Sequence, residues 1–318
     1  MPKQKMQRYT KKDFDAQFHG DATCLEWLKN YLYPEGIQCK KCGRVTKHHR
    51  VASRPSYSCD VCGNHVHPTA GTIFHKSPTP LTIWFYAIYL MSSTRCGISA
   101  KQIERETGVT YKTAWRMFKQ IRSMLAECDT PMGGEGTPGV EADEMYFGGK
   151  NKNKHLSKRK GFSGRTNDEK TPVFGVVERG GRVMALVTPN AMAKTVLPVI
   201  HERVLPATVV YTDDYPIYDK LAEHANGYQH RRIQHTQKVY VMGDIHTNTI
   251  EGFWSLIKRG IGGVYHSVGS QYLQSYLNEY SFRYNRRFDT QPMFVSFLNQ
   301  ISKDDFQARK AQITNGPF

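Results

Sequence analysis

The chain has 318 residues, with 44 lysines and arginines against 28 aspartates and glutamates, and therefore a formal net charge of +16. This length favours roughly two domains. A composition with 39% hydrophobic and 12% aromatic residues excludes a globally disordered protein. The positive excess favours a polyanionic partner such as nucleic acid, anionic lipid or an acidic protein.

The apolar segments do not predict membrane insertion. The longest, residues 81–91, is interrupted by Thr82 and is much shorter than the roughly 20 residues of a spanning helix. The N-terminus has no apolar core of the kind found in signal peptides. We therefore expect a cytosolic protein. Of its seven cysteines, four stand in two close pairs, which points to metal binding rather than disulfides.

The N-terminal third of the chain is predicted to be mainly helical. Apolar residues recur at helical spacing over residues 9–33, and Pro34-Glu35-Gly36 ends that pattern. Residues 81–93 indicate a buried helix. Two further helices, 99–106 and 111–125, are separated by a short turn that contains Gly108.

The last two of these helices form a candidate helix-turn-helix DNA-binding segment. The polar side of the second helix carries residues suited to phosphate and base contacts, namely Tyr111, Lys112, Arg116 and Lys119. An ordinary helical hairpin with a solvated basic face is the alternative interpretation.

Four cysteines stand in two close pairs, Cys39-x-x-Cys42 and Cys59-x-x-Cys62, with sixteen residues between the pairs. Each pair can place two thiolates at a tight turn, and the spacing is typical of a tetrahedral four-cysteine zinc site. Such sites are normally closed and structural, so we expect no catalysis there.

A Gly- and Pro-rich segment, residues 128–139, is predicted to be a linker and marks a domain boundary. The basic stretch 150–165 is predicted to be a loop, which could clamp DNA or simply be solvated.

After the linker the pattern changes to strands and helices in an order compatible with a mixed sheet flanked by helices. The predicted strands are 140–147, 173–178, 182–188, 208–212 and 229–234, and the predicted helices are 193–204, 217–224, 247–259, 270–286 and 291–302. The fold class is therefore multidomain α/β.

Three acids lie on or directly after these elements. Asp143 lies in the first strand, Asp213 ends a later strand, and Glu251 lies near the start of a C-terminal helix. Together they could hold two divalent ions, which would generate hydroxide and stabilise the entering and leaving oxygens at a phosphodiester. Carboxylate ligands favour Mg²⁺ or Mn²⁺ over zinc.

Each acid also has a simpler explanation. Asp213 could cap the helix that starts near Pro216, and Glu251 with Lys258 could belong to a solvated helix face. Strand alternation places Glu141 on the face of Asp143 and Glu144 on the other face. We expect Glu141 and Glu144 to support the site or to face solvent.

Several motifs resemble a known family over nearly the whole chain. They are Trp27-Leu28, Tyr33-Pro34-x-Gly36-x-x-Cys39-x-x-Cys42, Ala70-Gly71-Thr72-Ile73-Phe74-His75, Leu81-Thr82-x-Trp84-Phe85, Ala114-Trp115, Val140-Glu141-x-Asp143-Glu144-x-Tyr146-Phe147-Gly148-Gly149-Lys150, Tyr211-Thr212-Asp213, the run from His246 to Arg259, and Phe282-Arg283-Tyr284-Asn285-x-Arg287. The chain is similar to insertion-sequence transposases of the DDE superfamily, in the ISXO-like group with an N-terminal zinc ribbon.

This resemblance implies an RNase H-like (integrase-type) catalytic domain that nicks DNA with Mg²⁺ and joins the freed 3′ hydroxyl to target DNA. Carried over by position, Asp143 and Asp213 are the first two catalytic acids. Glu251 is the preferred third, seven residues before Lys258, and Asn248 is the alternative. Lys258 would bind phosphate near the cut.

The resemblance also implies the partners and the division into domains. The zinc ribbon and helix-turn-helix would recognise the terminal inverted repeats of double-stranded DNA, as a homodimer or higher oligomer in the nucleoid. The predicted segments are 1–36 N-terminal helices, 37–75 zinc ribbon, 76–127 helix-turn-helix region, 128–139 linker, 140–290 catalytic domain, and 291–318 C-terminal helix and tail. The alternatives are a DNA-binding regulator with a silent nuclease-like domain and a nuclease that cuts without joining.

Overall fold

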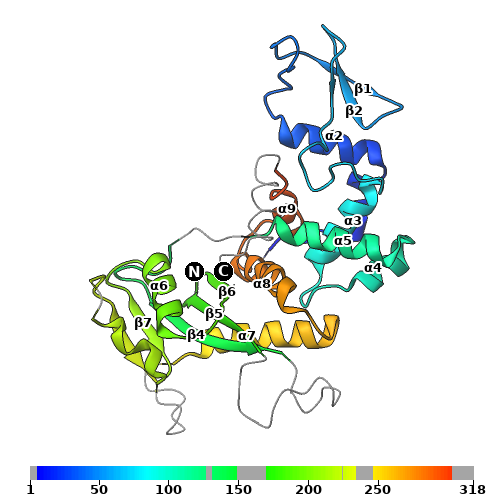
Figure 1. Cartoon of the computed structure of the whole chain (residues 1–318). Coiled ribbons are helices and arrows are strands. Elements are labelled where there is room, and N and C mark those ends of the chain that lie inside the picture. The colour runs from blue at the N-terminus through cyan, green and yellow to red at the C-terminus, as the bar shows by residue number, and fades with distance from the viewer. Residues whose placement is uncertain (1–5, 127–130, 149–169, 224, 234–245, 303–318) are drawn as a thin grey trace. The chain divides into compact units, whose positions relative to one another are not determined.

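The structure is a computed structural model that describes residues 6–126, 131–148, 170–223, 225–233 and 246–302. The chain divides into two compact units (Figure 1). Among the described residues, unit 1 comprises those within Met1–Leu125 and Phe288–Pro317, and unit 2 comprises those within Ala126–Arg287. The predicted basic loop, 150–165, lies outside the described residues.

Unit 1 begins with two helices, α1 (Lys11–Gln17) and α2 (Asp21–Leu32), where the sequence predicts one helical region. The hydroxyl of Thr10 accepts a hydrogen bond from the Asp13 backbone N–H, and the Asp13 carboxylate accepts from Thr10, so a capping box starts α1. The chain leaves the helical conformation at Phe18, and α2 starts after Gly20.

A small antiparallel sheet follows, with strands β1 (His48–Val51), β2 (Ser56–Cys59) and β3 (His65–Val66) in the order β1-β2-β3. Its central strand, β2, contacts α2: the hydroxyl of Tyr57 on β2 donates a 2.6 Å hydrogen bond to Glu26 on α2. Tyr57 itself is buried.

The next three helices confirm the predicted pattern. They are α3 (Leu81–Ser93), α4 (Ala100–Thr107) and α5 (Tyr111–Ser123). Ser99 caps α4 and Thr110 caps α5 through their hydroxyls, and Gly108 ends α4 at a left-handed φ of 71°. A glycine suits this position because the missing Cβ removes the steric penalty of a positive φ.

Helix α9 (Met293–Leu298) returns to unit 1 from the C-terminal part of the chain. It is shorter than the predicted 291–302. Its residue Phe294 packs among aromatic rings of the N-terminal helices, 5.9 Å from the ring centroids of both Phe14 and Phe18.

Unit 2 is built on a five-stranded sheet in the order β6-β5-β4-β7-β8. The strands are β4 (Val140–Phe147), β5 (Thr171–Glu178), β6 (Val183–Val187), β7 (Val209–Thr212) and β8 (Gln229–Arg232). β4, β5 and β6 pair antiparallel, whereas β7 pairs parallel with both β4 and β8. This is the mixed sheet that the sequence predicts.

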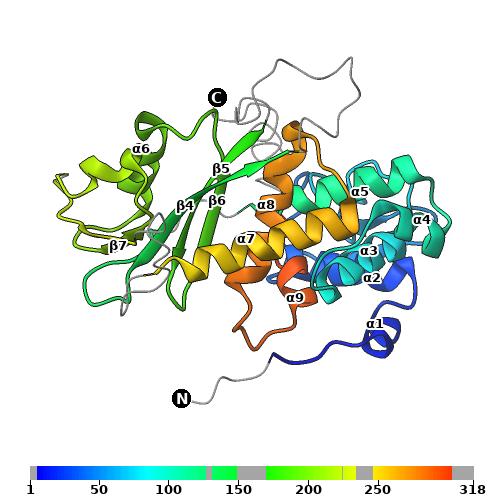
Figure 2. The ribbon, with the colours of Figure 1, turned by 90° about the horizontal axis from the view of Figure 1, so that it is seen from below.

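Helices cover both faces of this sheet. One face packs against α6 (Ala193–Arg203) and the 3₁₀ helix η4 (Pro216–Leu221) around Val140, Ala142 and Val176. The other face packs against α7 (Asn248–Gly260), which continues as the π-helical turn η6 (Ile261–Tyr265), and α8 (Ser270–Asn285) around Met145 and Val177 (Figure 2).

Two segments of unit 2 differ in detail from the sequence expectation. The predicted helix 217–224 is the short 3₁₀ helix η4. The described part of the Gly- and Pro-rich segment is bonded to unit 2, since the Gly133 N–H donates to Glu178 and the Gly134 N–H to Thr208, each at 2.8 Å. No helix among the described residues is long and apolar enough to cross a membrane.

Candidate functional site

The structure presents the three predicted acids from three neighbouring elements of unit 2. Asp143 lies on β4, and Asp213 follows β7 directly. These strands are parallel neighbours, with Glu141 paired to Tyr211. Glu251 lies in the first turn of α7, on the face of the sheet that Met145 also faces.

The environment of Asp143 shows that the acids interact. Burial raises the pKa of Asp143 to about 6, and the charges of Asp213 and Glu251 add to this rise. The indole of Trp254 opposes it by donating a 2.9 Å hydrogen bond to Asp143 Oδ2. Because the three carboxylates repel one another, a bound cation would relieve that repulsion.

Trp254 reaches Asp143 across a glycine. Gly175 on β5 is the direct cross-strand partner of Asp143, and a Cβ at Gly175 would lie 2.6 Å from Trp254 Cζ2. The missing side chain therefore leaves the space that the indole occupies.

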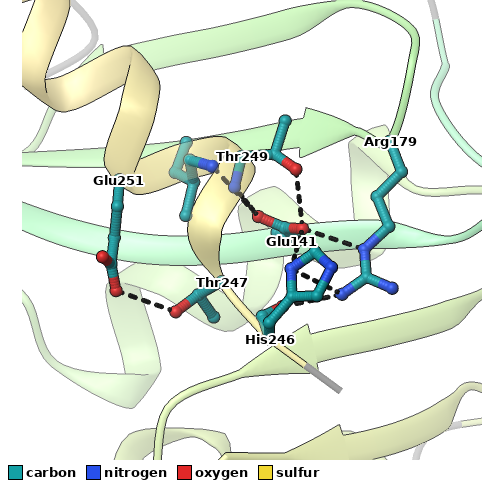
Figure 3. A network of polar contacts seen from close by, with 7 residues as sticks. Glu141, Arg179, His246, Thr247, Thr249 and Glu251 are labelled. Carbon is teal, nitrogen blue, oxygen red and sulfur yellow. Dashed lines mark hydrogen bonds and ion pairs between the residues drawn. The ribbon is translucent and has the colours of Figure 1, made fainter. Parts of the chain in front are cut away.

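Asp213 and Glu251 are each held locally. Asp213 Oδ1 accepts a 3.1 Å hydrogen bond from the Tyr215 backbone N–H. This forms a turn ahead of η4, which itself has no side-chain cap. Glu251 Oε1 accepts a 3.1 Å hydrogen bond from the Thr247 hydroxyl (Figure 3). The side chains of Asn248 and Lys258 on α7 are exposed.

Glu144 lies on the opposite face of β4 from Asp143. Burial raises its pKa to about 8, the charges of Asp143 and Asp213 add to the rise, and Tyr218 lowers it. Glu144 is half-buried, and its neighbour Tyr218 on η4 is fully buried.

Glu141 is fully buried, which rules out the solvent-facing interpretation. Arg179 Nε donates a 2.8 Å hydrogen bond to its carboxylate, and the backbone N–H of Thr249 donates another at 2.8 Å (Figure 3). His246 Nδ1 lies 3.2 Å from Glu141 Oε1. Glu141 thus contacts the segment that leads into α7.

Sequence reasoning assigned no role to Arg179 or Trp254. The position of Trp254, three residues after Glu251 on one helix, was a signal, because that spacing puts both side chains on one helix face. Arg179 follows a strand and precedes two glycines, and nothing in that pattern distinguishes it from an ordinary turn residue.

The four predicted zinc ligands lie together in unit 1. The sulfur atoms of Cys39, Cys42, Cys59 and Cys62 all lie within 4.8 Å of one another. Within the described ranges, these residues are the one group of three or more His, Cys, Asp or Glu side chains arranged to hold a metal ion. The three acids of unit 2 do not form such a closed group.

The predicted DNA-contacting residues lie on α5. Tyr111, Lys112 and Lys119 are exposed. Arg116 is half-buried and donates a 3.3 Å hydrogen bond to the Ser77 hydroxyl. Lys112 and Lys119 are therefore accessible, with Lys119 Nζ 5.8 Å from the centre of the Trp115 ring, whereas Arg116 also supports its own unit.

Comparison with known proteins places the chain in a family. Residues 134–285 match the model of the ISXO2-like transposase domain. An uncharacterized protein in transposable element ISH50 of Halobacterium salinarum is 29% identical over 278 residues, which cover 84% of this chain and 91% of that protein.

An uncharacterized transposase-like protein of Haemophilus influenzae is 32% identical over 123 residues, which cover 38% of this chain and 94% of that protein. No solved structure is significantly similar to the chain. The matched residues 134–285 include Asp143, Asp213 and Glu251 and nearly all of unit 2. The chain belongs to the ISXO2-like family of insertion-sequence transposases.

Proposed function

We propose that the protein binds the ends of its insertion sequence and catalyses metal-dependent DNA cleavage and strand transfer. The observation that carries this proposal is geometric: Asp143 and Asp213 come from adjacent parallel strands, and Glu251 comes from helix α7, which packs on the face of the sheet that carries Asp143. Family membership supports a transposition activity.

The proposed catalytic domain is RNase H-like and spans 140–290. Three antiparallel strands followed by two parallel strands, with helices on both faces, support this assignment. The two strands that present Asp143 and Asp213 are adjacent and parallel in that sheet.

Asp143, Asp213 and Glu251 are the proposed ligands of Mg²⁺ or Mn²⁺. Their carboxylate oxygens are the ligands that these ions prefer. When bound, the ions would activate the attacking oxygen and neutralise charge at the phosphodiester. Trp254 holds Asp143 and Thr247 holds Glu251 in place for that task. Glu251 is the preferred third acid, since its charge contributes to the raised pKa of Asp143, and Asn248 is the alternative.

The proposed reaction has two steps. In the first, water attacks a phosphorus at the element end, and the P–O bond to the 3′ oxygen breaks, so that this oxygen leaves as a hydroxyl. In the second, the freed 3′ oxygen attacks a target phosphorus and loses its proton, and the target's own 3′ oxygen departs and takes a proton up. Lys258 is the proposed phosphate contact.

The proposed DNA-binding region is the four-cysteine module, as a zinc ribbon, together with α4 and α5. The exposed Lys112 and Lys119 support phosphate contacts. Binding of paired element ends implies a dimer or higher oligomer.

Replacing Lys112 with alanine should weaken binding of every DNA sequence. It should also reduce the slope of log affinity against log salt concentration by about one. Lys12→Ala on α1 should change neither.

Cleavage of labelled element-end DNA by the full chain with Mg²⁺ tests the catalytic proposal. Wild type and Asp219→Asn, an exposed acid of the same unit, should cleave. Asp143→Asn should bind the same DNA without cutting it.

Equal cleavage by Asp143→Asn and wild type would contradict the assigned site. Binding without cleavage by wild type in Mg²⁺ and in Mn²⁺ would favour the regulator. Cleavage without joined products would favour a nuclease that does not transfer strands.

A further inference from the structure

The three predicted catalytic acids share a positional feature. In each of the three elements, the residue two positions before the acid is Glu141 or a residue that contacts Glu141 or Arg179. These residues and Arg179 form one side-chain cluster. The pairs of cluster residue and acid are Glu141 and Asp143 on β4, Tyr211 and Asp213 at β7, and Thr249 and Glu251 on α7.

Glu141 is the centre of this cluster. Its carboxylate is fully buried and accepts hydrogen bonds from Arg179 Nε at 2.8 Å, from the Thr249 hydroxyl at 2.8 Å, and from the backbone N–H groups of Thr249 and Ile250 at 2.8 and 3.0 Å (Figure 3). A buried carboxylate that accepts four hydrogen bonds is strongly held, because these bonds offset the cost of removing its charge from water.

Arg179 extends the cluster to the third element. Its guanidinium carbon lies 3.6 Å from the centre of the Tyr211 ring on β7, and its Nη2 donates a 2.7 Å hydrogen bond to the His246 carbonyl oxygen. Tyr211 is itself the parallel-strand partner of Glu141. The Glu141–Arg179 pair therefore contacts β4, β7 and the start of α7 together.

The cluster also takes over a task that α7 does not perform for itself. The first N–H groups of a helix lack partners within the helix and need a cap. Thr247 occupies the N-cap position of α7, but its side chain does not cap the helix. Glu141 accepts from those N–H groups instead, and the Thr247 hydroxyl donates to the Glu251 carboxylate.

We propose that Glu141 and Arg179 are positioning residues that hold the three acid-bearing elements in the arrangement that metal binding requires. This inference rests on the proposed function, because it assigns the cluster a role at the same site. Neither residue touches the DNA or the metal in this proposal. They act through the backbone of α7 and the ring of Tyr211.

The central variant is Glu141→Gln, which preserves the shape but replaces one acceptor oxygen with an NH₂ group that faces donors. The matched control is Glu279→Gln, because Glu279 is the other fully buried glutamate described in unit 2 that pairs with an arginine, with Arg283 at 2.6 Å on α8. A second variant, Thr249→Val, removes one hydrogen bond and leaves every charge in place.

Three measurements on the full chain separate positioning from general stability. They are hydrogen exchange of the peptide that covers the start of α7, Mn²⁺ binding by electron paramagnetic resonance, and the kcat and KM of element-end cleavage. Glu141→Gln should weaken Mn²⁺ binding and lower kcat by about tenfold or more, leave the KM for DNA unchanged, and speed exchange at Thr249 and Ile250. Arg179→Lys should retain more kcat than Arg179→Met.

The control and the second variant make the outcome decisive. Glu279→Gln should lower the stability of unit 2 without changing Mn²⁺ binding or kcat. If Glu141→Gln unfolds the chain, Thr249→Val carries the test with smaller changes of the same sign. Equal behaviour of Glu141→Gln and Glu279→Gln in all three measurements would overturn the proposal.

Failure of the proposed function has a different signature. A wild type that neither binds Mn²⁺ nor cleaves would refute that function, and with it the positioning role in metal binding. Faster exchange with unchanged Mn²⁺ binding and kcat would overturn the positioning role alone.

Discussion

The indole Nε1 of Trp254 donates a 2.9 Å hydrogen bond to Asp143 Oδ2. This contact joins α7, which presents Glu251, to β4, which presents Asp143. The helix that supplies the third acid of the site therefore also orients the first.

Trp254→Phe should slow cleavage by about tenfold, because it removes one hydrogen bond to a charged group worth about 1.5 kcal/mol. The same bond lowers the pKa of Asp143, so its loss should raise that pKa above about 6. Metal binding needs the ionised carboxylate. When the pH is lowered, cleavage by Trp254→Phe should therefore be lost at a higher pH than cleavage by wild type. Cleavage rates across a pH series check this, with Trp27→Phe in α2 as the control. An unchanged pH profile would count against the role of the bond.

Gly175→Ala should destabilise unit 2 by about 1–3 kcal/mol, because the new methyl group overlaps the Trp254 indole. It should also slow cleavage, since the indole must move away from Asp143. The control is Gly252→Ala on α7, where an added Cβ meets no atom within 4 Å. That control should raise stability by roughly 0.5–1 kcal/mol through helix propensity. Urea unfolding measures both, and equal stability of the two variants would refute the packing argument.

His230 should make the stability of unit 2 depend on pH. Burial, assisted by the charge of Arg232, lowers the pKa of His230 to about 4 from the usual 6.5. As the pH falls below about 6.5, His230 binds a proton in the unfolded chain but not in the folded chain. The free energy of unfolding therefore decreases as the pH falls toward the folded-state pKa of about 4. Between about pH 7 and about pH 5 the loss should be about 2 kcal/mol.

Urea unfolding of wild type and His230→Gln at both pH values isolates this contribution, because the other titrating groups are common to both proteins. Wild type should lose more stability than the variant on acidification. Identical losses would show that His230 titrates normally in the folded protein.

Removal of zinc should destabilise unit 1 alone. The four clustered cysteine sulfurs predict about one zinc ion per chain, measurable by atomic absorption. Cys59→Ser should lose this zinc and weaken DNA binding, whereas Cys96→Ser, outside the cluster, should keep both. A chelator should lower the unfolding temperature of unit 1 and leave unit 2 unchanged. Full zinc content in Cys59→Ser would contradict the four-cysteine site.

Local patterns predicted most elements of the fold. The alternation over 140–147 and the helical spacing over 81–93 are confirmed by β4 and α3. The prediction was wrong where a helix depends on its surroundings, since 217–224 forms only the short 3₁₀ helix η4. The return of α9 to unit 1 was not anticipated, because the aromatic partners of Phe294 lie far from it in sequence.

By itself, the sequence determined the candidate residues: the cysteine pairs by their spacing, and Asp143, Asp213 and Glu251 by their places at strands and a helix. Tertiary structure alone decided what holds the acids together. Glu141, which the sequence left as a supporting or solvent-facing acid, is buried beneath Arg179 and the start of α7. The reason is physical: burial and capping by a distant side chain depend on which segments pack together. The spacing of residues along one strand or helix does not predict that packing.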